Sequence, residues 1–163
     1  MFLKNMHYLF LAMMVLGVLF LAINLYSGYQ FKTEPLSKEI QAKIDAKEEE
    51  VISNIKKHYG VDFRVPLIIS NALPSNLYGV AVLSERGSIK VYINKKRIRE
   101  SLDYILDDVI AHEYAHAVMF ASGNHSRKEG HSAQWQEICK NLGGSRCDRF
   151  VNHNDIIYGK ITF

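Results

Sequence analysis

Hydrophobic residues are concentrated in one long run near the beginning of the chain, and elsewhere they recur in shorter periodic patterns. The run covers residues 8–26 and contains a single strongly polar side chain, Asn24. At a rise of about 1.5 Å per residue, a helix of this length approaches the roughly 30 Å hydrocarbon core of a bilayer. The pattern therefore predicts a helix that crosses a membrane once.

Two other interpretations of this run are a cleaved secretory signal and a buried helix of a soluble core. Lys4 and His7 form a short basic region in front of the run, as in a signal peptide. The run is longer than the usual apolar part of a signal, however, and residues 23–30 offer no clean A-x-A pair of small residues. We therefore expect an uncleaved membrane anchor and linker over residues 1–35. Basic residues stand on both sides of the run, so its orientation stays open.

Residues 36–163 have the shorter periods of an α+β domain. Apolar residues between positions 37 and 59 recur at helical spacing among charged ones, which predicts an amphipathic helix that stops at Gly60. Helical patterns return over residues 101–121 and 131–144.

A β pattern separates the first of these helices from the other two. Residues 65–70, 77–83 and 88–94 are rich in β-branched and aromatic side chains, and they predict three short strands. Gly79 lies inside the second of them. A glycine in a strand indicates a β-bulge or a close approach by another backbone.

Composition adds two constraints on the chemistry. The formal net charge is only +3, which is too small to argue for a nucleic-acid partner. The two cysteines, Cys139 and Cys147, cannot form a four-cysteine zinc site, so any metal must be held mostly by other ligands. A turn through Gly143 and Gly144 could join them as a disulfide outside the cytoplasm. Two unpaired, partly buried thiols are the equally open alternative.

Candidate chemistry lies in the helix expected over residues 101–121. His112 and His116 are four residues apart, so both imidazoles lie on one face, where they can bind the same zinc ion. Glu113 is rotated by about 100° from His112, so it can reach a metal-bound water more easily than the metal itself. The H-E-x-x-H pattern thus predicts two ligands and a general base. Histidines that merely fill a core are the alternative, and they need polar partners there.

Two aspartates precede this pattern, at positions 107 and 108. They either favour the N-terminal half of the helix by their charge or orient a metal ligand from behind. The sequence does not distinguish these roles.

A third ligand is needed because a catalytic zinc site usually has three protein ligands and one position for water. The candidates are His125, Glu129, His131 and His153. His131 is favoured, since it stands at the start of an expected helix, where a rigid element can hold its ring. His125 lies in an expected loop.

The segments around these residues resemble those of a known family. "HEYAHA" at positions 112–117 and "KEGHSAQW" at positions 128–135 are similar to the H-E-x-x-H-A and G-H-x-x-[FW] segments of the SprT-like zinc metallopeptidases. The resemblance covers about residues 61–144, including the two strands before the motif. It implies His131 as the third ligand, with Trp135 in the aromatic position.

The resemblance implies a zincin-like α+β fold, in which a small twisted sheet packs on the active-site helix and its neighbours and zinc lies between them. Zn²⁺ would be held by His112, His116 and His131. Glu113 would serve as the general base of a zinc-dependent endopeptidase. An extended protein or peptide substrate would lie along the exposed sheet edge expected at residues 78–82.

Three features depart from the family pattern. Ser132 stands where the family more often has Gly, which is expected to change the loop geometry but no ligand. Many members carry a C-terminal zinc ribbon or DNA-binding extension, and this sequence ends at Phe163 without one, so a nucleic-acid partner is not expected. An N-terminal membrane segment is also atypical. We therefore expect a membrane-tethered zinc endopeptidase. A non-catalytic, membrane-anchored zinc-binding interaction module and a purely structural membrane protein are the alternatives. Tyr158, His153 and His125 are possible donors to the transition-state oxyanion.

Overall fold

The computed structural model describes residues 2–124 and 131–147, and the chain divides into two units, Met1–Ser37 and Lys38–Phe163. The first unit contains one helix, α1 (Phe2–Thr33). Its 26-residue segment Met6–Phe31 is long and apolar enough to cross a membrane, although a signal sequence or a buried helix of a soluble protein has the same property.

Helix α1 extends beyond the apolar run that predicted it. Residues 27–33, the connector that follows the apolar run in the expected anchor and linker over residues 1–35, continue the helix. It ends two residues before Pro35, and proline disfavours the helical conformation in the residue that precedes it. The expected connector is therefore limited to the few residues between Thr33 and the next helix.

The second unit begins with helix α2 (Lys38–Tyr59), directly after Ser37. Its buried residues are Ile44, Val51, Ile52 and Ile55, which lie on one face at the spacing of an amphipathic helix. The remaining elements follow in the order β1 (Leu67–Ser70), β2 (Gly79–Leu83), β3 (Ile89–Asn94), α3 (Lys95–Glu100), α4 (Leu102–Tyr104), the π-helical turn η1 (Ile105–Val109), α5 (Ile110–Ala121) and α6 (Ala133–Asn141). This content confirms the α+β class.

The sheet has three strands in the order β1-β3-β2 and is mixed. Strand β3 lies in the middle, parallel to β1 and antiparallel to β2. The β2–β3 pairing runs without interruption from Gly79↔Ile93 to Leu83↔Ile89. The bulge considered for Gly79 is therefore wrong. Strand β2 is an outer strand of the described sheet, as expected for residues 78–82.

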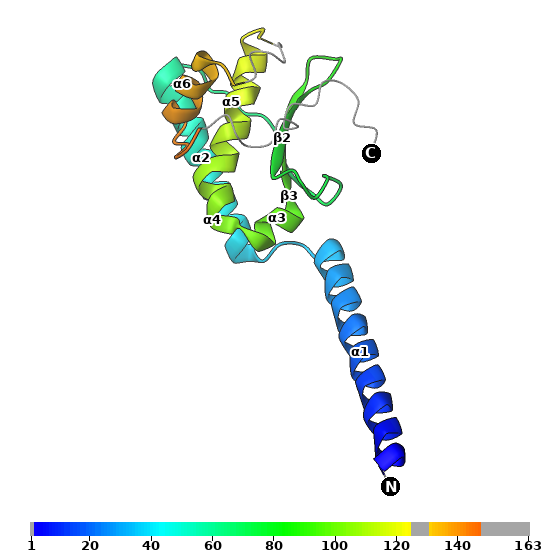
Figure 1. Ribbon diagram of the computed structural model, residues 1–163. Helices are drawn as coiled ribbons and strands as arrows, with labels where there is room; N and C mark the ends of the chain where they lie inside the picture. The colour runs from blue at the N-terminus through cyan, green and yellow to red at the C-terminus, as the bar shows by residue number, and fades with distance from the viewer. Residues whose placement is uncertain (1, 125–130, 148–163) are drawn as a thin grey trace. The chain divides into compact units, whose positions relative to one another are not determined.

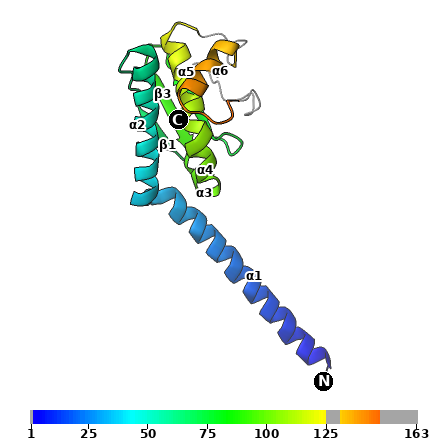
Figure 2. The same cartoon turned by 90° about the vertical axis from the view of Figure 1, so that its left-hand side faces the viewer.

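Helices α2, α5 and α6 lie on one side of the sheet, with α5 facing the strands (Figures 1 and 2). Helix α5 is buried along most of its length, since it packs on β2 and β3 and also on α2 and α6. The centre of the core is formed by fully buried apolar side chains from all of these elements: Ile44, Ile55, Val80, Val91, Ile93, Ile110, Ala111, Ala115, Trp135 and Leu142. The histidine-bearing helix is thus the central helix of the unit.

The single helix expected over residues 101–121 is wrong in one respect. Five of its residues, Ile105–Val109, form the π-helical turn η1 between α4 and α5. A π turn places one extra residue in the helix, and such turns are frequent at functional sites. Here it directly precedes the segment that carries His112 and His116.

Candidate metal centre

Three histidines from α5 and from the residue before the N-cap of α6 lie close together. His112 and His116 come from consecutive turns of α5, and His131 lies just before α6. One ligand atom from each ring lies within 4.8 Å of the others. The Nε2 atoms of His112 and His116 are 3.2 Å apart, and those of His112 and His131 are 3.3 Å apart. The chain therefore brings together the three histidines that the sequence analysis selected.

The separation of these nitrogens fits a tetrahedral metal. Ligands at 2.0 to 2.1 Å from a tetrahedral zinc ion lie about 3.3 Å from one another. Nε2 of His112 lies at nearly this separation from Nε2 of His116 and from Nε2 of His131, so the three imidazoles suit three corners of such a tetrahedron and would leave the fourth for a water molecule. The donor set and its spacing thus suit a divalent metal ion that prefers nitrogen ligands.

Burial keeps the two α5 imidazoles neutral. His112 and His116 are 3% and 1% exposed. Burial, together with repulsion from His131, lowers the pKa of His112 to about 3. Burial, followed by repulsion from His112 and His131, also lowers the pKa of His116 well below its usual value. At neutral pH these rings therefore present lone pairs, which is the protonation state that a metal ion requires.

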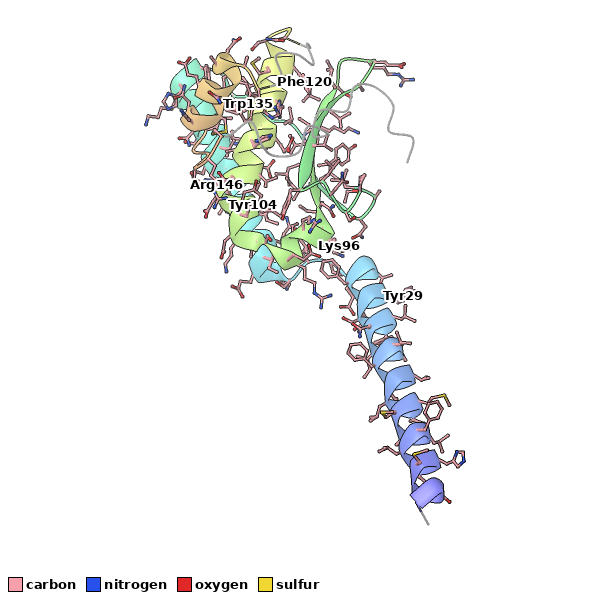
Figure 3. The ribbon with its side chains drawn as sticks, viewed as in Figure 1. Tyr29, Lys96, Tyr104, Phe120, Trp135 and Arg146 are labelled. Carbon is pink, nitrogen blue, oxygen red and sulfur yellow. A yellow bond between two sulfur atoms is a disulfide. The ribbon has the colours of Figure 1, made fainter. Side chains whose placement is uncertain are left out.

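Trp135, which is labelled on α6 in Figure 3, packs against the cluster. Its ring contacts the rings of all three histidines. Its ring is stacked on His116 at a centroid distance of 5.0 Å and an interplanar angle of 26°. His112 and His131 meet it edge-on, at 4.6 and 4.5 Å. Since Trp135 is fully buried on α6, it fixes the distance between that helix and the histidines of α5.

The position of His131 is set by the start of α6. Ser132 is the N-cap of this helix, and its hydroxyl accepts a hydrogen bond from the backbone N–H of Trp135. The cap fixes the direction in which the chain enters the helix, and the half-buried His131 is the residue before it. The imidazole is therefore held by a defined helix terminus, as the sequence analysis expected.

Glu113 is buried between α5 and the edge strand β2. It is 1% exposed, and it does not belong to the histidine cluster. A Cβ atom on Gly79 would lie 2.8 Å from Cγ and 3.0 Å from Oε1 of Glu113. Gly79 is thus needed because a side chain approaches it, and not because of the backbone approach that the sequence analysis considered.

The two aspartates that precede the motif have different environments. Both lie inside η1, in the N-terminal half of the helical run from Leu102 to Ala121, and the favourable effect of their charge on that half stays a prediction. Asp107 is exposed, whereas Asp108 is buried and accepts hydrogen bonds from Ser145 Oγ and Arg146 N. Sequence reasoning missed these partners, because they lie almost forty residues further along the chain.

Cys139 and Cys147 form a disulfide, which the sequence left open. Several candidates from the sequence analysis, namely His125, Glu129, His153 and Tyr158, lie outside the described residues. Of the four candidates for a third ligand, His131 is the one that the described structure places beside His112 and His116.

The second unit of the chain, which contains the histidine cluster, is similar to a known protein family. The SprT-like family model matches residues 42–154, which is well over half of the chain and includes most of α2, the sheet, η1, α5 and α6. The chain belongs to the SprT-like family. No curated protein and no solved structure matches the chain. For this SprT-like chain, the resemblance noted from the H-E-x-x-H-A and G-H-x-x-W segments is therefore confirmed at the level of the family.

Proposed function

We propose that this SprT-like chain is a membrane-tethered, zinc-dependent endopeptidase with a zincin-like fold. The observation that carries the proposal is the convergence of three imidazoles beside Glu113: Nε2 of His112 lies 3.2 Å from that of His116 and 3.3 Å from that of His131. His112, His116 and His131 would hold the metal. The lowered pKa values of His112 and His116 support this role, because neutral rings bind metal without first losing a proton.

Glu113 is proposed as the general base. A bound zinc ion would lower the pKa of its water toward 7 and polarise the carbonyl group of the scissile bond. Glu113 would accept the proton of the attacking water and pass it to the leaving amine. Its burial against Gly79 supports this role, because a carboxylate confined between α5 and β2 keeps one position relative to His112.

The outer strand β2 (Gly79–Leu83) is proposed as the binding edge for an extended peptide segment of a protein substrate. Its partner β3 occupies one side of the strand. A peptide on the other side would add a strand to the sheet through main-chain hydrogen bonds. Because Gly79 begins this strand and touches Glu113, a peptide bound there would pass beside the proposed base.

Membrane tethering is proposed for helix α1. The support is its apolar 26-residue segment, which is long enough to span a bilayer without cleavage. The size of the protein recovered from membranes, compared with the full 163-residue chain, tests this part of the proposal. A shorter protein that lacks residues 1–35 and stays in the soluble fraction would show that the segment is a signal.

Replacing Glu113 by Gln separates an enzyme from a non-catalytic zinc module. The change preserves the size of the side chain but removes the base, so we expect cleavage of an unfolded protein substrate to fall by about 10²-fold or more with zinc still bound. The matched control is Glu137→Gln, since Glu137 is exposed on α6. Unchanged cleavage in the zinc-loaded Glu113→Gln protein would rule out the proposed mechanism.

Metal analysis tests the ligand assignment independently of activity. We expect one zinc ion per chain and a sharp loss of zinc affinity in His131→Ala. His58→Ala is the matched control, because His58 is exposed near the end of α2. His125→Ala should also keep its zinc. Full zinc retention in His131→Ala would overturn the assignment, and a wild-type chain without zinc would favour a purely structural protein.

A further inference from the structure

Residues 139–147, which we call the disulfide loop, join α6 back to the start of the metal-bearing helix. The loop begins at Cys139 on α6 and closes at Cys147, whose Cα lies 5.8 Å from that of Cys139. Both cysteines are buried, at 1% and 5% exposure. The loop is therefore part of the packed unit.

The local sequence fits the closed form of the disulfide loop. A Cβ on Gly144 would lie 2.7 Å from each of the two sulfur atoms, so only glycine leaves room for them. Gly143 has a φ of +89°, and Cys147 has a φ of +41°, which is unusual for a residue with a side chain. Such a conformation persists only where the surrounding contacts hold it.

Ser145 and Arg146 of the disulfide loop form hydrogen bonds with Asp108 in η1. Oδ1 of Asp108 accepts hydrogen bonds from Ser145 Oγ at 2.9 Å and from the backbone N–H of Arg146 at 2.7 Å. The backbone N–H of Ser145 also donates to the carbonyl of Asp107, at 3.3 Å. Donors aimed at a buried carboxylate are among the stronger hydrogen bonds in proteins. Hydrogen bonds thus join the disulfide loop to two successive residues of the π turn, Asp107 and Asp108.

The side chain of Arg146 extends this contact over the surface of the turn. Its Nε lies 3.7 Å from Oδ2 of Asp108. Its guanidinium lies over the ring of Tyr104 at 5.7 Å from the centroid, and the two residues are neighbours in Figure 3. Arg146 is itself largely exposed, so the ion pair contributes little, and the buried hydrogen bonds carry the contact.

Asp108 stands four residues before His112, so it lies one turn below that ligand in the same helical run. The disulfide loop starts from α6, the helix that follows His131 and carries Trp135. Consequently, the loop links the helix of two proposed ligands to the helix beside the third, at a point separate from the metal cluster.

We propose that the disulfide loop is a positioning clamp for the metal centre. By holding Asp108 and the π turn against α6, it sets the separation between His112 on α5 and His131 before α6. Asp108 is a positioning residue that acts through the backbone of the turn. This inference rests on the proposed metal site and adds to it the requirement for a closed disulfide.

The clamp also implies an oxidising compartment. Closing the disulfide removes two electrons and two protons from the two thiols, and a thiol–disulfide oxidant of that compartment must accept them. Such bonds form and persist on the outer side of the cytoplasmic membrane or in the lumen of the secretory pathway. A domain that depends on this bond for its metal site matures on the non-cytoplasmic side of the membrane.

The test measures metal affinity in the full chain, purified in detergent, with Co²⁺ as a spectroscopic probe. We expect Cys139→Ser/Cys147→Ser to raise the Kd for Co²⁺ about tenfold or more and to alter its ligand-field spectrum. Asp108→Ala should act in the same way. Asp107→Ala is the matched control, because the exposed neighbour contributes only its backbone carbonyl to the contact, and its Kd should not change.

Combination of the changes distinguishes a clamp from general stabilisation. If the disulfide and Asp108 act through one contact, adding Asp108→Ala to Cys139→Ser/Cys147→Ser raises the Kd for Co²⁺ little further. If the two changes only destabilise the protein independently, their effects on the Kd add. Asp108→Asn, which keeps an acceptor oxygen, should restore most of the affinity. Ser145→Ala leaves the disulfide intact and removes the hydroxyl that donates to Asp108. It therefore replaces the cysteine variant in this test if that variant does not fold. We expect it to raise the Kd about threefold.

A folded cysteine variant with the wild-type Kd and spectrum would overturn the clamp, and so would an unchanged Kd in both Asp108→Ala and Ser145→Ala. If the wild-type chain binds no Co²⁺, the proposed metal function fails by itself. In that case, the rate of amide hydrogen exchange of residues 105–112 in the metal-free chain tests whether the disulfide loop holds the π turn. Faster exchange in the cysteine variant supports the clamp, and equal exchange overturns it.

Discussion

The side chain of Glu113 lies against Gly79, so closely that a single added methyl group at Gly79 would come within 2.8 Å of it. This relationship joins the proposed general base on α5 to the first residue of the edge strand β2. The backbone of Gly79 therefore forms one wall of the space that the carboxylate occupies.

Gly79→Ala should displace Glu113 without touching a histidine. We expect kcat to fall on the order of 100-fold, because a displacement of about 1 Å at a reacting group has effects of this size. Zinc content should stay at one ion per chain. The matched control is Ile69→Val, a half-buried change on β1, which β3 separates from the proposed binding edge. Equal kcat in Gly79→Ala and wild type would show that the contact does not constrain the base.

Trp135 is the single tryptophan of the chain and touches all three histidines. Its fluorescence should therefore report metal binding directly. We expect the emission of the metal-free chain to change on addition of Zn²⁺ with an endpoint at one equivalent, and a chelator should reverse the change. In His131→Ala the response should weaken or require much more zinc. An emission that does not respond to zinc in the wild type would contradict the geometry of the cluster.

Tyr114 on α5 forms a hydrogen bond with Glu48 on α2. Its hydroxyl donates to Glu48 Oε1 at 2.6 Å, and burial, with Glu48 beside it, raises the pKa of Tyr114, so the donor proton is retained. We expect Tyr114→Phe to lower the free energy of unfolding by about 1 to 2 kcal/mol, measured by urea denaturation. Tyr59→Phe is the control, since its hydroxyl accepts a hydrogen bond from Asn141 at an exposed position, and it should cost less than about 0.5 kcal/mol. Equal losses in the two variants would contradict this account.

The metal-free chain should lose stability as the pH falls. The pKa of His112 is lowered to about 3, and that of His116 is also lowered, whereas histidine in an unfolded chain titrates near 6.5. Below about 6.5 the unfolded chain therefore binds more protons than the folded one, so the free energy of unfolding decreases. We expect a decrease on the order of 2 kcal/mol between pH 7.5 and 5.5.

Urea denaturation in the presence of a chelator measures this pH dependence. His116→Ala should weaken it by removing one of the two groups, whereas His58→Ala, an exposed site, should leave it unchanged. A metal-free wild type whose stability is constant over this interval would show that the two rings are not buried in their neutral form.

Thiol labelling in intact cells tests the compartment. The chain has only two cysteines, both in the disulfide, so a membrane-impermeant thiol reagent should not label it. After treatment with an impermeant reductant, we expect two labels per chain without permeabilisation of the cells. Labelling without reductant would show free thiols. Labelling only after lysis would place the domain in the cytoplasm, and either result would contradict an extracytoplasmic domain.

Much of this protein follows from local patterns in its sequence. The burial of Ile44, Val51 and Ile55 follows from their spacing, because one face of a helix must be apolar to pack on a core. The spacing of His112 and His116 alone places two imidazoles on one face. The later G-H-x-x-W segment identified His131 and Trp135 through family resemblance, and the structure brings all of these side chains together.

Only the tertiary structure decided how distant segments meet. The central position of β3 between β1 and β2, the contact of Gly79 with Glu113, and the fastening of Asp108 by Ser145 each join residues far apart in the chain. Sequence periodicity records which face of an element is buried, but it does not record what covers that face. Gly79 and Asp108 acquire their roles only in the folded chain, because folding brings Glu113 against Gly79 and Ser145 against Asp108. Folding likewise brings Cys139 and Cys147 close enough to form the disulfide.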